Sequence, residues 1–478
     1  MEYFFTLTNI LLTIFLAWYL ITNLQWYNYQ IQRVITKHHK KHWHIIYFIT
    51  PTALFYLLDN IYFSIYFYIL FIPSFVWWYK HLDTKLVITM RVKRFLAILL
   101  FSTLVVTILC LASTTCNNTG VILPLLITLA ITTILEKIFF IDFKSQAKRK
   151  LKSKEELIIV AITASFGKTS IKNYLHQILS RKFNTYMTPR SVNTIGGIVK
   201  DVNNDLPNDT QVYIAEAGAR VQGDIATISK FLEPQYAIIG SVGEQHIEYF
   251  KTLDNIIHTK MEILQSPRLK HGFVHSSVPI LEYKTITKFP NNLQILKSDL
   301  NGLEFSIDID EKTEIFKAPI LGEFNAVNLT SVILMAKQLG MDIDTIKETF
   351  KSLKSVDHRL QKIEAGGKII LDDSFNGNLE GMLEAINISA THNGRKVIIT
   401  PGLVESTVEA NTILAKEIDK IFDLVIITGS LNKDTLEKNI NQDKTIVLED
   451  KSNMQDILAE HTQAGDLILF ANDAPNFI

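Results

Sequence analysis

The chain has 478 residues, and its 48 basic and 48 acidic side chains cancel. A chain of this length usually folds into about three domains, each with its own buried core. The balanced charge excludes the strongly basic surface of a typical nucleic-acid binder. No cysteine follows residue 116, so the polar remainder cannot hold a disulfide framework or a thiolate metal site, which fits a reducing compartment.

The first 143 residues have the composition of a membrane segment. All five tryptophans lie before residue 120, and no charged side chain occurs from Tyr3 to Gln32. That run is longer than the roughly 20 residues that a membrane-spanning helix needs. Further apolar stretches follow at 45–58, 61–79, 95–113 and 121–141. We therefore expect residues 1–143 to form about five transmembrane helices.

The basic residues predict how these helices are oriented. Lys and Arg gather at 33–41, 80–94 and 144–152, whereas the connections at 59–60 and 114–120 contain none. Because cytoplasmic connections are enriched in Lys and Arg, five spans with the N-terminus outside place all three basic clusters in the cytoplasm. The sequence thus predicts a multi-pass protein of the cytoplasmic membrane whose polar part faces the cytoplasm.

After residue 155, β-rich runs alternate with amphipathic helical stretches, which is typical of an α/β domain with mostly parallel strands. Residues 271–318 show short strands and few helix signals, and this favours an antiparallel insertion or edge. The first alternating unit is expected to have strands at 157–163, 212–216 and 236–241 and helices from 168, at 224–232, at 253–264 and at 325–339.

A second alternating unit follows, and we place the domain boundary near residue 362. Its expected strands are 368–372, 396–400, 424–428 and 466–470, and its expected helices are 379–390 and 409–421. The predicted organisation is therefore a membrane segment (1–143), a central P-loop-type α/β domain (144–362) and a C-terminal Rossmann-like α/β domain (363–478).

The most informative motif follows the first strand of the central unit. Residues 164–170 read Ala-Ser-Phe-Gly-Lys-Thr-Ser and lead into a helix. In a phosphate-binding loop, backbone N–H groups at the helix start hold phosphate oxygens, the lysine meets the β and γ phosphates, and a hydroxyl reaches Mg²⁺. The usual first glycine of that pattern is Ile162 here. The candidate ATP-binding residues are Ser165, Gly167, Lys168, Thr169 and Ser170.

Residues 161–170 resemble the phosphate loop of the Mur ligase family, usually Thr-Gly-Ser/Thr-Asn-Gly-Lys-Thr, from which Ala164 and Phe166 depart. Further segments that resemble family motifs follow in the family's order: Glu216-Ala217-Gly218 with Gly223-Asp224-Ile225, His246 to Phe250, Lys260 to Ile263, Gly322 to Asn328, Arg359-Leu360 and Asp372 to Asn378. The first of these is similar to the signature of the branch that adds D-alanyl-D-alanine.

The resemblance implies a role for each matching residue. Mg²⁺ would be held by Thr169 and Glu216, a second Mg²⁺ by His246, and Lys260 would be carbamylated, so that it becomes an anionic ligand. Arg359 would stabilise the transferring phosphate, as Lys168 does from the loop. Asn325 and Asn328 would approach the adenine, and Asp373 the ribose. The candidate substrate residues are Ser191, Asn193 and Thr194, in the loop 188–197, together with Asn376 and Asn378.

Each of these residues also has an ordinary structural interpretation. Alone, Glu216 would be a solvated carboxylate and Lys260 a surface charge on an amphipathic helix. Asn376 and Asn378 near a glycine are common turn residues. The ordered set of motifs favours the functional interpretation, while the loop at 188–197 could equally be a plain turn.

The implied activity is ATP-dependent addition of D-alanyl-D-alanine to UDP-MurNAc-tripeptide in bacterial peptidoglycan synthesis. The membrane segment stands where family members carry a small domain for the uridine nucleotide, so recognition of that nucleotide is not implied. Three alternatives remain open: another Mur-type amide ligase, a non-catalytic membrane scaffold for cell-wall enzymes, and an ATP-driven transporter.

Overall fold

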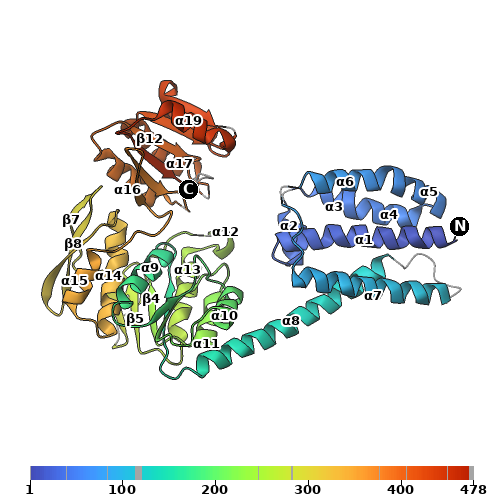
Figure 1. Cartoon of the computed structure of the whole chain (residues 1–478), viewed down its shortest axis with the longest axis horizontal. Helices are drawn as coiled ribbons and strands as arrows, with labels where there is room; N and C mark the ends of the chain where they lie inside the picture. The colour runs from blue at the N-terminus through green and yellow to red at the C-terminus, as the bar shows by residue number, and fades with distance from the viewer. Residues whose placement is uncertain are drawn as a thin grey trace. The chain divides into compact units, whose positions relative to one another are not determined.

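The computed structural model describes residues 2–38, 40–82, 84–112, 121–245, 247–280, 284–375, 377–404, 406–448 and 450–472. The chain divides into two compact units, Met1–Ser145 and Gln146–Ile478 (Figure 1). This division separates the apolar segment from the polar remainder. The expected split of the remainder into two domains stays a prediction.

All the regular elements among the described residues of the first unit are helices. Its elements are α1 (Glu2–Trp26), α2 (Ile31–Lys37), α3 (His42–His44), η1 (Ile45–Ile49), α4 (Thr50–Leu57), α5 (Asn60–Tyr66), η2 (Phe67–Phe71), α6 (Ile72–Lys80), α7 (Met90–Ala112) and α8 (Ile122–Lys152). The segments η1 and η2 are π-helical turns, which are wider than α-helical turns. Each comes just before a proline, Pro51 or Pro73. Proline lacks the N–H of a regular helical turn, and a local widening is a common adjustment to it.

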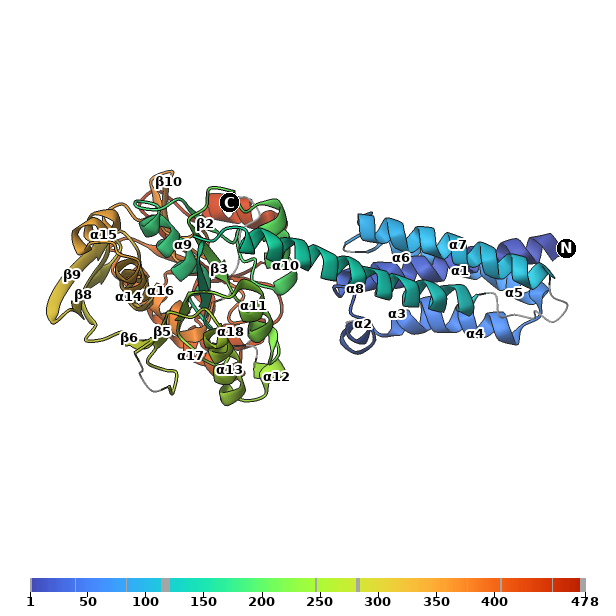
Figure 2. The same cartoon turned by 90° about the horizontal axis from the view of Figure 1, so that it is seen from below.

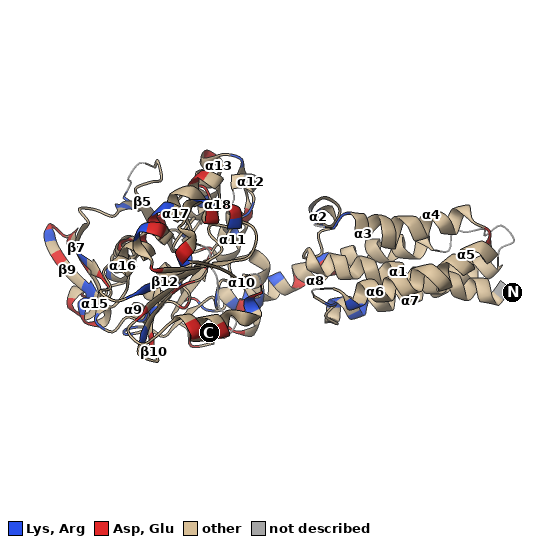
Figure 3. Cartoon of the chain, turned by 90° about the horizontal axis from the view of Figure 1, so that it is seen from above, with Lys and Arg blue, Asp and Glu red and all other residues tan. Residues whose placement is uncertain are grey.

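Among the described residues, four helices are long and apolar enough to cross a membrane: Tyr3–Trp26, Asn60–Lys80, Met90–Ala112 and Ile122–Lys152. The remaining expected span, 45–58, falls in the shorter helical stretch from α3 to α4, so the count of five stays a prediction. The connection 114–120 lies outside the described residues. In Figure 3 the helices α1 and α4 are almost free of charged residues.

Aromatic packing and one charged cluster hold this unit together. The buried Trp78 ring lies 4.9 Å from Phe75, 5.1 Å from Tyr19 and 5.5 Å from Tyr47, measured between ring centroids. Glu136, in α8, accepts hydrogen bonds of 2.8 and 2.6 Å from the Arg94 guanidinium, in α7. The pair neutralises two charges that the apolar environment would otherwise penalise.

The second unit begins in the last turns of α8, which Figure 2 shows as one uninterrupted helix. Its first sheet has the order β2-β3-β1-β4-β5-β6, with all neighbours parallel. The strands are β1 (Ile158–Thr163), β2 (Thr185–Met187), β3 (Val212–Glu216), β4 (Tyr236–Ile239), β5 (His271–His275) and β6 (Ile286–Phe289). Because β1 lies between β3 and β4, the loops after these three strands meet at one edge, where α/β proteins bind ligands.

The helices of this part are α9 (Lys168–Leu179), α10 (Ile195–Asn204), α11 (Asp224–Leu232), α12 (Ile247–Phe250), α13 (Leu253–Met261), η3 (Glu262–Gln265), α14 (Glu323–Gln338) and α15 (Ile343–Phe350). The expected antiparallel character of 271–318 is correct only for β7 (Gln294–Asp299), β8 (Gly302–Ile309) and β9 (Lys312–Ala318). It is wrong for β5 and β6, which extend the parallel sheet, because strands this short carry no signal of their pairing direction.

The second alternating region forms the predicted Rossmann-like sheet, with the order β10-β11-β15-β12-β13-β14. Its strands are β10 (Gln361–Ala365), β11 (Lys368–Asp373), β12 (Lys396–Thr400), β13 (Leu424–Thr428), β14 (Thr445–Leu448) and β15 (Leu467–Ala471). Its helices are α16 (Leu379–Ala390), α17 (Val408–Ile421), α18 (Lys433–Asn439), η4 (Gln442–Lys444), η5 (Lys451–Asn453) and α19 (Met454–His461). Only β10 is antiparallel to its neighbour. The α/β fold class expected for the polar part is therefore confirmed.

Candidate active site

The phosphate loop joins β1 to α9, and its glycine is required by geometry. Gly167 has φ 81°, and a Cβ atom built there would lie 2.4 Å from Asn328 Oδ1. Any other residue would be strained by its backbone and would collide with α14. No side chain caps the start of α9 among the described residues. Its first backbone N–H groups are thus available to an anion, together with the positive end of the helix dipole.

Lys168 is folded back onto the loop. Its Nζ donates to the carbonyl oxygens of Ala164 at 2.7 Å and Ser165 at 3.0 Å. Burial lowers the pKa of Lys168 to about 8; nearby Glu216 raises it, and Arg359 lowers it further. A bound polyphosphate would restore the ammonium form, since a nearby negative charge favours the charged lysine.

The two departures from the family's loop pattern are accommodated by glycines that follow β4. A Cβ atom at Gly240 would lie 2.9 Å from Ala164 Cβ, and one at Gly243 would lie 3.0 Å from the Phe166 ring. Ser165 also ties the loop to this segment, because its Oγ donates to Gly243 O at 2.9 Å. The altered loop is therefore packed against the chain that follows β4.

Glu216, at the end of β3, is the centre of the site. Its carboxylate is 1% exposed. It accepts hydrogen bonds from Thr169 Oγ1 at 3.0 Å and from Asn193 Nδ2 at 3.1 Å. Lys172 Nζ lies 3.3 Å from Glu216 Oε2. The structure thus brings together Thr169 and Glu216, the residues predicted to hold Mg²⁺, and adds Asn193, which was predicted to contact substrate.

Lys172 was missed by the sequence analysis. It lies one helical turn after Lys168, on the buried face of α9 that also carries Ile171 and Leu175. A buried lysine needs an anionic partner. The position of Lys172 on the apolar face of the helix could therefore have predicted such a partner from the sequence. Its Nζ also donates to the carbonyl of Arg190, which connects Glu216 to the loop at 188–197.

Lys260, in α13, is buried rather than on the surface. The side chain is 3% exposed, and no hydrogen bond or ion pair of its Nζ is found among the described residues. Burial lowers its pKa well below the ordinary value; Lys168 lowers it further, and Glu216 raises it. The surface interpretation of Lys260 is therefore wrong.

Residues around the start of the second sheet complete the candidate site. The Arg359 guanidinium donates to Phe375 O at 2.9 Å and lies 4.6 Å from the centre of the Phe375 ring. Burial raises the pKa of Asp373 to about 7, against the lowering effect of Arg359. Asp373 Oδ1 also accepts from the backbone N–H of Leu360 at 3.1 Å. Arg359 and Asp373, predicted from separate motifs, thus interact.

The remaining candidates have simpler surroundings. Asn325 and Asn328 are buried and joined by a 3.1 Å hydrogen bond. Thr194 and Asn378 cap α10 and α16 with their side-chain oxygens, so each has a structural role of its own. Ser170 is buried in α9, whereas Ser191 is exposed. His246 and Asn376 lie outside the described residues.

The described residues fit Mg²⁺ through oxygen donors alone. Thr169 Oγ1 and the Glu216 carboxylate are hard ligands of the type Mg²⁺ prefers. No group of three or more His, Cys, Asp or Glu side chains suited to a metal is found in the described ranges. Mg²⁺ commonly binds through one or two protein oxygens and completes its shell with substrate phosphates and water, which matches this sparse set.

The comparisons with known proteins match this chain to one family. The Mur ligase middle domain matches residues 162–336. A UDP-N-acetylmuramoyl-tripeptide–D-alanyl-D-alanine ligase of Bacillus subtilis is 25% identical over 65% of this chain and 72% of its own length. The enzyme of that name from Escherichia coli is 26% identical over 53% of this chain and 59% of its own length. The chain therefore spans between 59% and 72% of these two relatives.

Solved structures show the same fold. The MurF ligase of Thermotoga maritima in complex with ADP has a TM-score of 0.60 and 22% identity, and the match covers 70% of this chain and 80% of that one. MurF from Acinetobacter baumannii gives a TM-score of 0.60 at 21% identity, over 70% of this chain and 77% of that one.

Proposed function

The chain belongs to the Mur ligase family, whose middle domain it carries at residues 162–336, and from this membership we propose that it is an ATP-dependent, ADP-forming amide-bond ligase. Its proposed substrates are UDP-MurNAc-tripeptide and D-alanyl-D-alanine. The terminal carboxylate of the tripeptide attacks the γ phosphorus and ADP leaves. The amine of D-alanyl-D-alanine then displaces inorganic phosphate and loses one proton, which forms the amide bond.

The observation that carries this proposal is the contact between the phosphate loop and Glu216. Thr169, from the loop, and Glu216, from the branch-specific motif, are 3.0 Å apart. A phosphate-binding helix start beside a buried carboxylate is an arrangement that holds a magnesium-bound nucleotide. Bound there, Mg²⁺ would polarise the transferring phosphoryl oxygens.

The roles of the residues around it are proposed from the family motifs that they match. Lys168 turns from the loop carbonyls to the β and γ phosphates and offsets their charge. Arg359 supplies a planar set of donors to the transferring phosphate. Asn325 and Asn328 contact the adenine and Asp373 the ribose. His246 serves a second Mg²⁺. The loop with Ser191, Asn193 and Thr194, together with Asn376 and Asn378, positions the substrate.

Lys260 is proposed to act as a carbamate. A neutral lysine amine attacks carbon dioxide at its carbon, forms a C–N bond and releases one proton. Burial and Lys168 lower the pKa of Lys260, which raises the fraction of reactive amine. The carbamate formed is an anion and an oxygen donor. It would balance the charge of Lys168 and serve as a ligand of the second Mg²⁺.

We also propose that the enzyme lies in a bacterial cytoplasmic membrane, with the ligase unit in the cytoplasm. The four long apolar helices and the basic connections on one predicted side support this location. There it would act in peptidoglycan synthesis, and so in cell-wall growth, cell shape and division. Membrane-associated cell-wall enzymes are its expected partners, together with membrane lipid.

A phosphate-release assay tests the function. The purified full chain is incubated with ATP, Mg²⁺ and UDP-MurNAc-tripeptide, with and without D-alanyl-D-alanine, and the product is identified by mass spectrometry. Phosphate release and a UDP-MurNAc-pentapeptide are expected only when both substrates are present. A product formed with glutamate instead would identify a different ligase of the family. Absence of ATP turnover with every amino acid or dipeptide offered would favour the scaffold.

A further inference from the structure

A small cavity lies within the first unit, between the end of α1, the start of α7 and the middle of α8. Its volume is about 180 Å³, and its lining residues are Ile21, Leu24, Tyr29, Ile31, Arg91, Phe95, Leu129, Thr132 and Thr133. Most of this lining is hydrocarbon. The polar groups are the Arg91 guanidinium of α7, the Thr132 and Thr133 hydroxyls of α8 and the Tyr29 hydroxyl.

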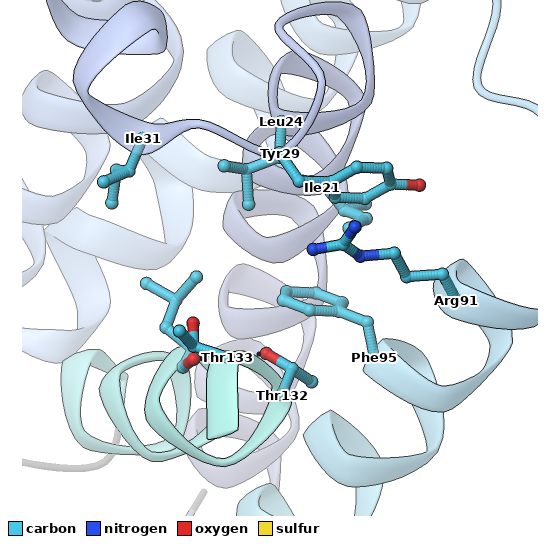
Figure 4. Close-up of a pocket in the computed structure, with 9 residues that line it drawn as sticks. Ile21, Leu24, Tyr29, Ile31, Arg91, Phe95, Thr132 and Thr133 are labelled. Atoms are coloured by element: carbon cyan, nitrogen blue, oxygen red, sulfur yellow. Dashed lines mark hydrogen bonds between the residues drawn. The ribbon is translucent and has the colours of Figure 1, made fainter. Parts of the chain in front are cut away.

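Arg91 is the only charged residue of the lining, and Figure 4 shows its guanidinium pointing into the space between the Tyr29 and Phe95 rings. The guanidinium carbon lies 3.6 Å from the centre of the Tyr29 ring. No hydrogen bond of this guanidinium is found among the described residues, although it carries five N–H donors. The Arg91 side chain is 39% exposed, so its N–H donors are accessible to an anion that enters the cavity.

The neighbouring charges leave this cluster positive. Glu136 Oε1 accepts from Arg94 at 2.6 Å, whereas Arg91 Nε lies 3.7 Å from Glu136 Oε2. In the described part of the chain, Glu136 is the only carboxylate paired with either arginine. Two guanidinium groups therefore share one carboxylate, and the net charge of the cluster is +1. An anion in the cavity would neutralise it.

From this geometry we infer that the cavity binds the phosphate headgroup of a lipid. Guanidinium groups bind phosphate through two parallel hydrogen bonds, and the Thr133 hydroxyl offers a further contact, whereas the Thr132 hydroxyl donates to Thr128 O at 2.6 Å. The apolar wall formed by Ile21, Leu24 and Leu129 suits the first carbons of a hydrocarbon chain. A cavity of this size is smaller than the roughly 300 Å³ of most ligand pockets. It would hold the phosphate and the adjoining carbons, and the rest of the chain would extend into the bilayer.

The predicted topology agrees with this site. Arg91 lies in the basic connection 80–94, which the charge pattern assigns to the cytoplasmic side. Anionic lipids are abundant in the cytoplasmic leaflet of membranes. The inference concerns the membrane unit alone, and its test does not depend on ligase activity.

Binding to the purified full chain in a non-ionic detergent tests the site. The probes are dioctanoyl phosphatidic acid, dioctanoylglycerol, which lacks the phosphate, and inorganic phosphate. We expect saturable binding of the phosphatidic acid alone, and a loss of about tenfold or more in affinity for Arg91→Gln, as for the removal of one charge-assisted hydrogen bond. Lys93→Gln, an exposed position of α7 two residues on, serves as the matched control and should change affinity by less than about twofold.

Several results would overturn the inference. Equal losses in Arg91→Gln and Lys93→Gln would indicate general surface charge, and equal binding of dioctanoylglycerol would show that no phosphate is recognised. Competition by inorganic phosphate at the same concentration would show that no lipid chain is recognised. Because Arg91 also stacks on Tyr29, Arg91→Gln could unfold. Thr133→Phe then decides, since it fills the cavity and leaves Arg91 in place: normal binding by this variant would exclude the cavity.

Discussion

Glu216 and Lys172 form a buried ion pair in the centre of the candidate site, with 3.3 Å between the carboxylate and the ammonium. Because the two side chains are 1% and 0% exposed, water cannot compensate either charge alone. We therefore expect Lys172→Met to destabilise the protein by about 3 to 5 kcal/mol, the usual cost of leaving one buried charge unpaired. Thermal unfolding of the full chain measures this. Lys200→Met, at an exposed position of α10, is the control. An equal loss of stability in the two variants would contradict the ion pair between Lys172 and Glu216.

Lys168→Ala is expected to abolish ligation and leave the protein folded. Among the described residues its Nζ donates only to loop carbonyls and to the Gln245 side chain, so its removal costs the fold little. The expected loss of turnover is about 10²-fold or more, the scale of removing one electrostatic stabiliser. Steady-state ATP turnover and circular dichroism measure the two effects. Lys416→Ala, exposed on α17, should turn over normally. Near-normal turnover of Lys168→Ala would remove the ATP-site assignment.

The carbamate proposal for Lys260 predicts an unusual pattern of substitutions. Lys260→Ala should lose most activity and recover part of it with added formate or acetate, because a small anion can occupy the vacated space. Lys260→Arg should fail as fully as alanine, since a guanidinium remains cationic and cannot react with carbon dioxide. The measurement is ATP turnover with and without the carboxylate. Wild-type activity of Lys260→Arg would refute the carbamate.

The lowered pKa of Lys168 predicts that ATP binding takes up a proton. In the free protein this pKa is about 8, so above that pH the neutral amine predominates. Polyphosphate raises the pKa in the complex, and affinity should therefore fall as pH rises through 8. Calorimetric titration at about pH 8.5 in two buffers of different ionisation enthalpy measures the proton uptake. Lys168→Arg should show none. Equal heats for wild type in both buffers would contradict the assignment.

The number of membrane crossings determines where the N-terminus lies. If the polar unit is cytoplasmic, five spans put the N-terminus outside, whereas the four long helices alone would put it inside. We expect the first arrangement, because the second would expose the basic cluster at 33–41 on the outer side. An epitope tag before residue 2, digested by protease in intact spheroplasts, checks this. A protected tag would rule out five spans.

The sequence predicted the α/β units and most of their helices and strands, because the period of the apolar residues agreed with the residues that mark the ends of these elements. The helix 379–390 and the strands 396–400 and 424–428 match α16, β12 and β13 exactly in their bounds. The missed elements are short, such as β2 and β14, or lie in segments without a clear apolar period, such as α15, α18 and α19. Strand pairing is a long-range property, so β5 and β6 were assigned to the wrong kind of sheet.

The candidate site was predictable only where a residue type is unusual at its position. The glycine, lysine and hydroxyl of the loop carry the chemistry of phosphate binding, and the structure places Glu216 beside them. Whether a lysine is buried is decided by distant parts of the chain, so Lys172 was missed and Lys260 needed the family's motif. The capping roles of Thr194 and Asn378 were not predicted either, because they depend on the residue at which each helix begins.

Helix α14 has contacts in its first turns with the phosphate loop of the first sheet and with α16, which accompanies the second sheet. Asn328 packs against Gly167 in the phosphate loop, while the backbone N–H of Glu323 donates to the Glu384 carboxylate, in α16, at 3.0 Å. Opening either contact disturbs the same helix. A nucleotide that holds the start of α9 in place should therefore slow amide hydrogen exchange in α14 and α16 as well, although α16 belongs to the other sheet. The two sheets would then protect each other against local unfolding.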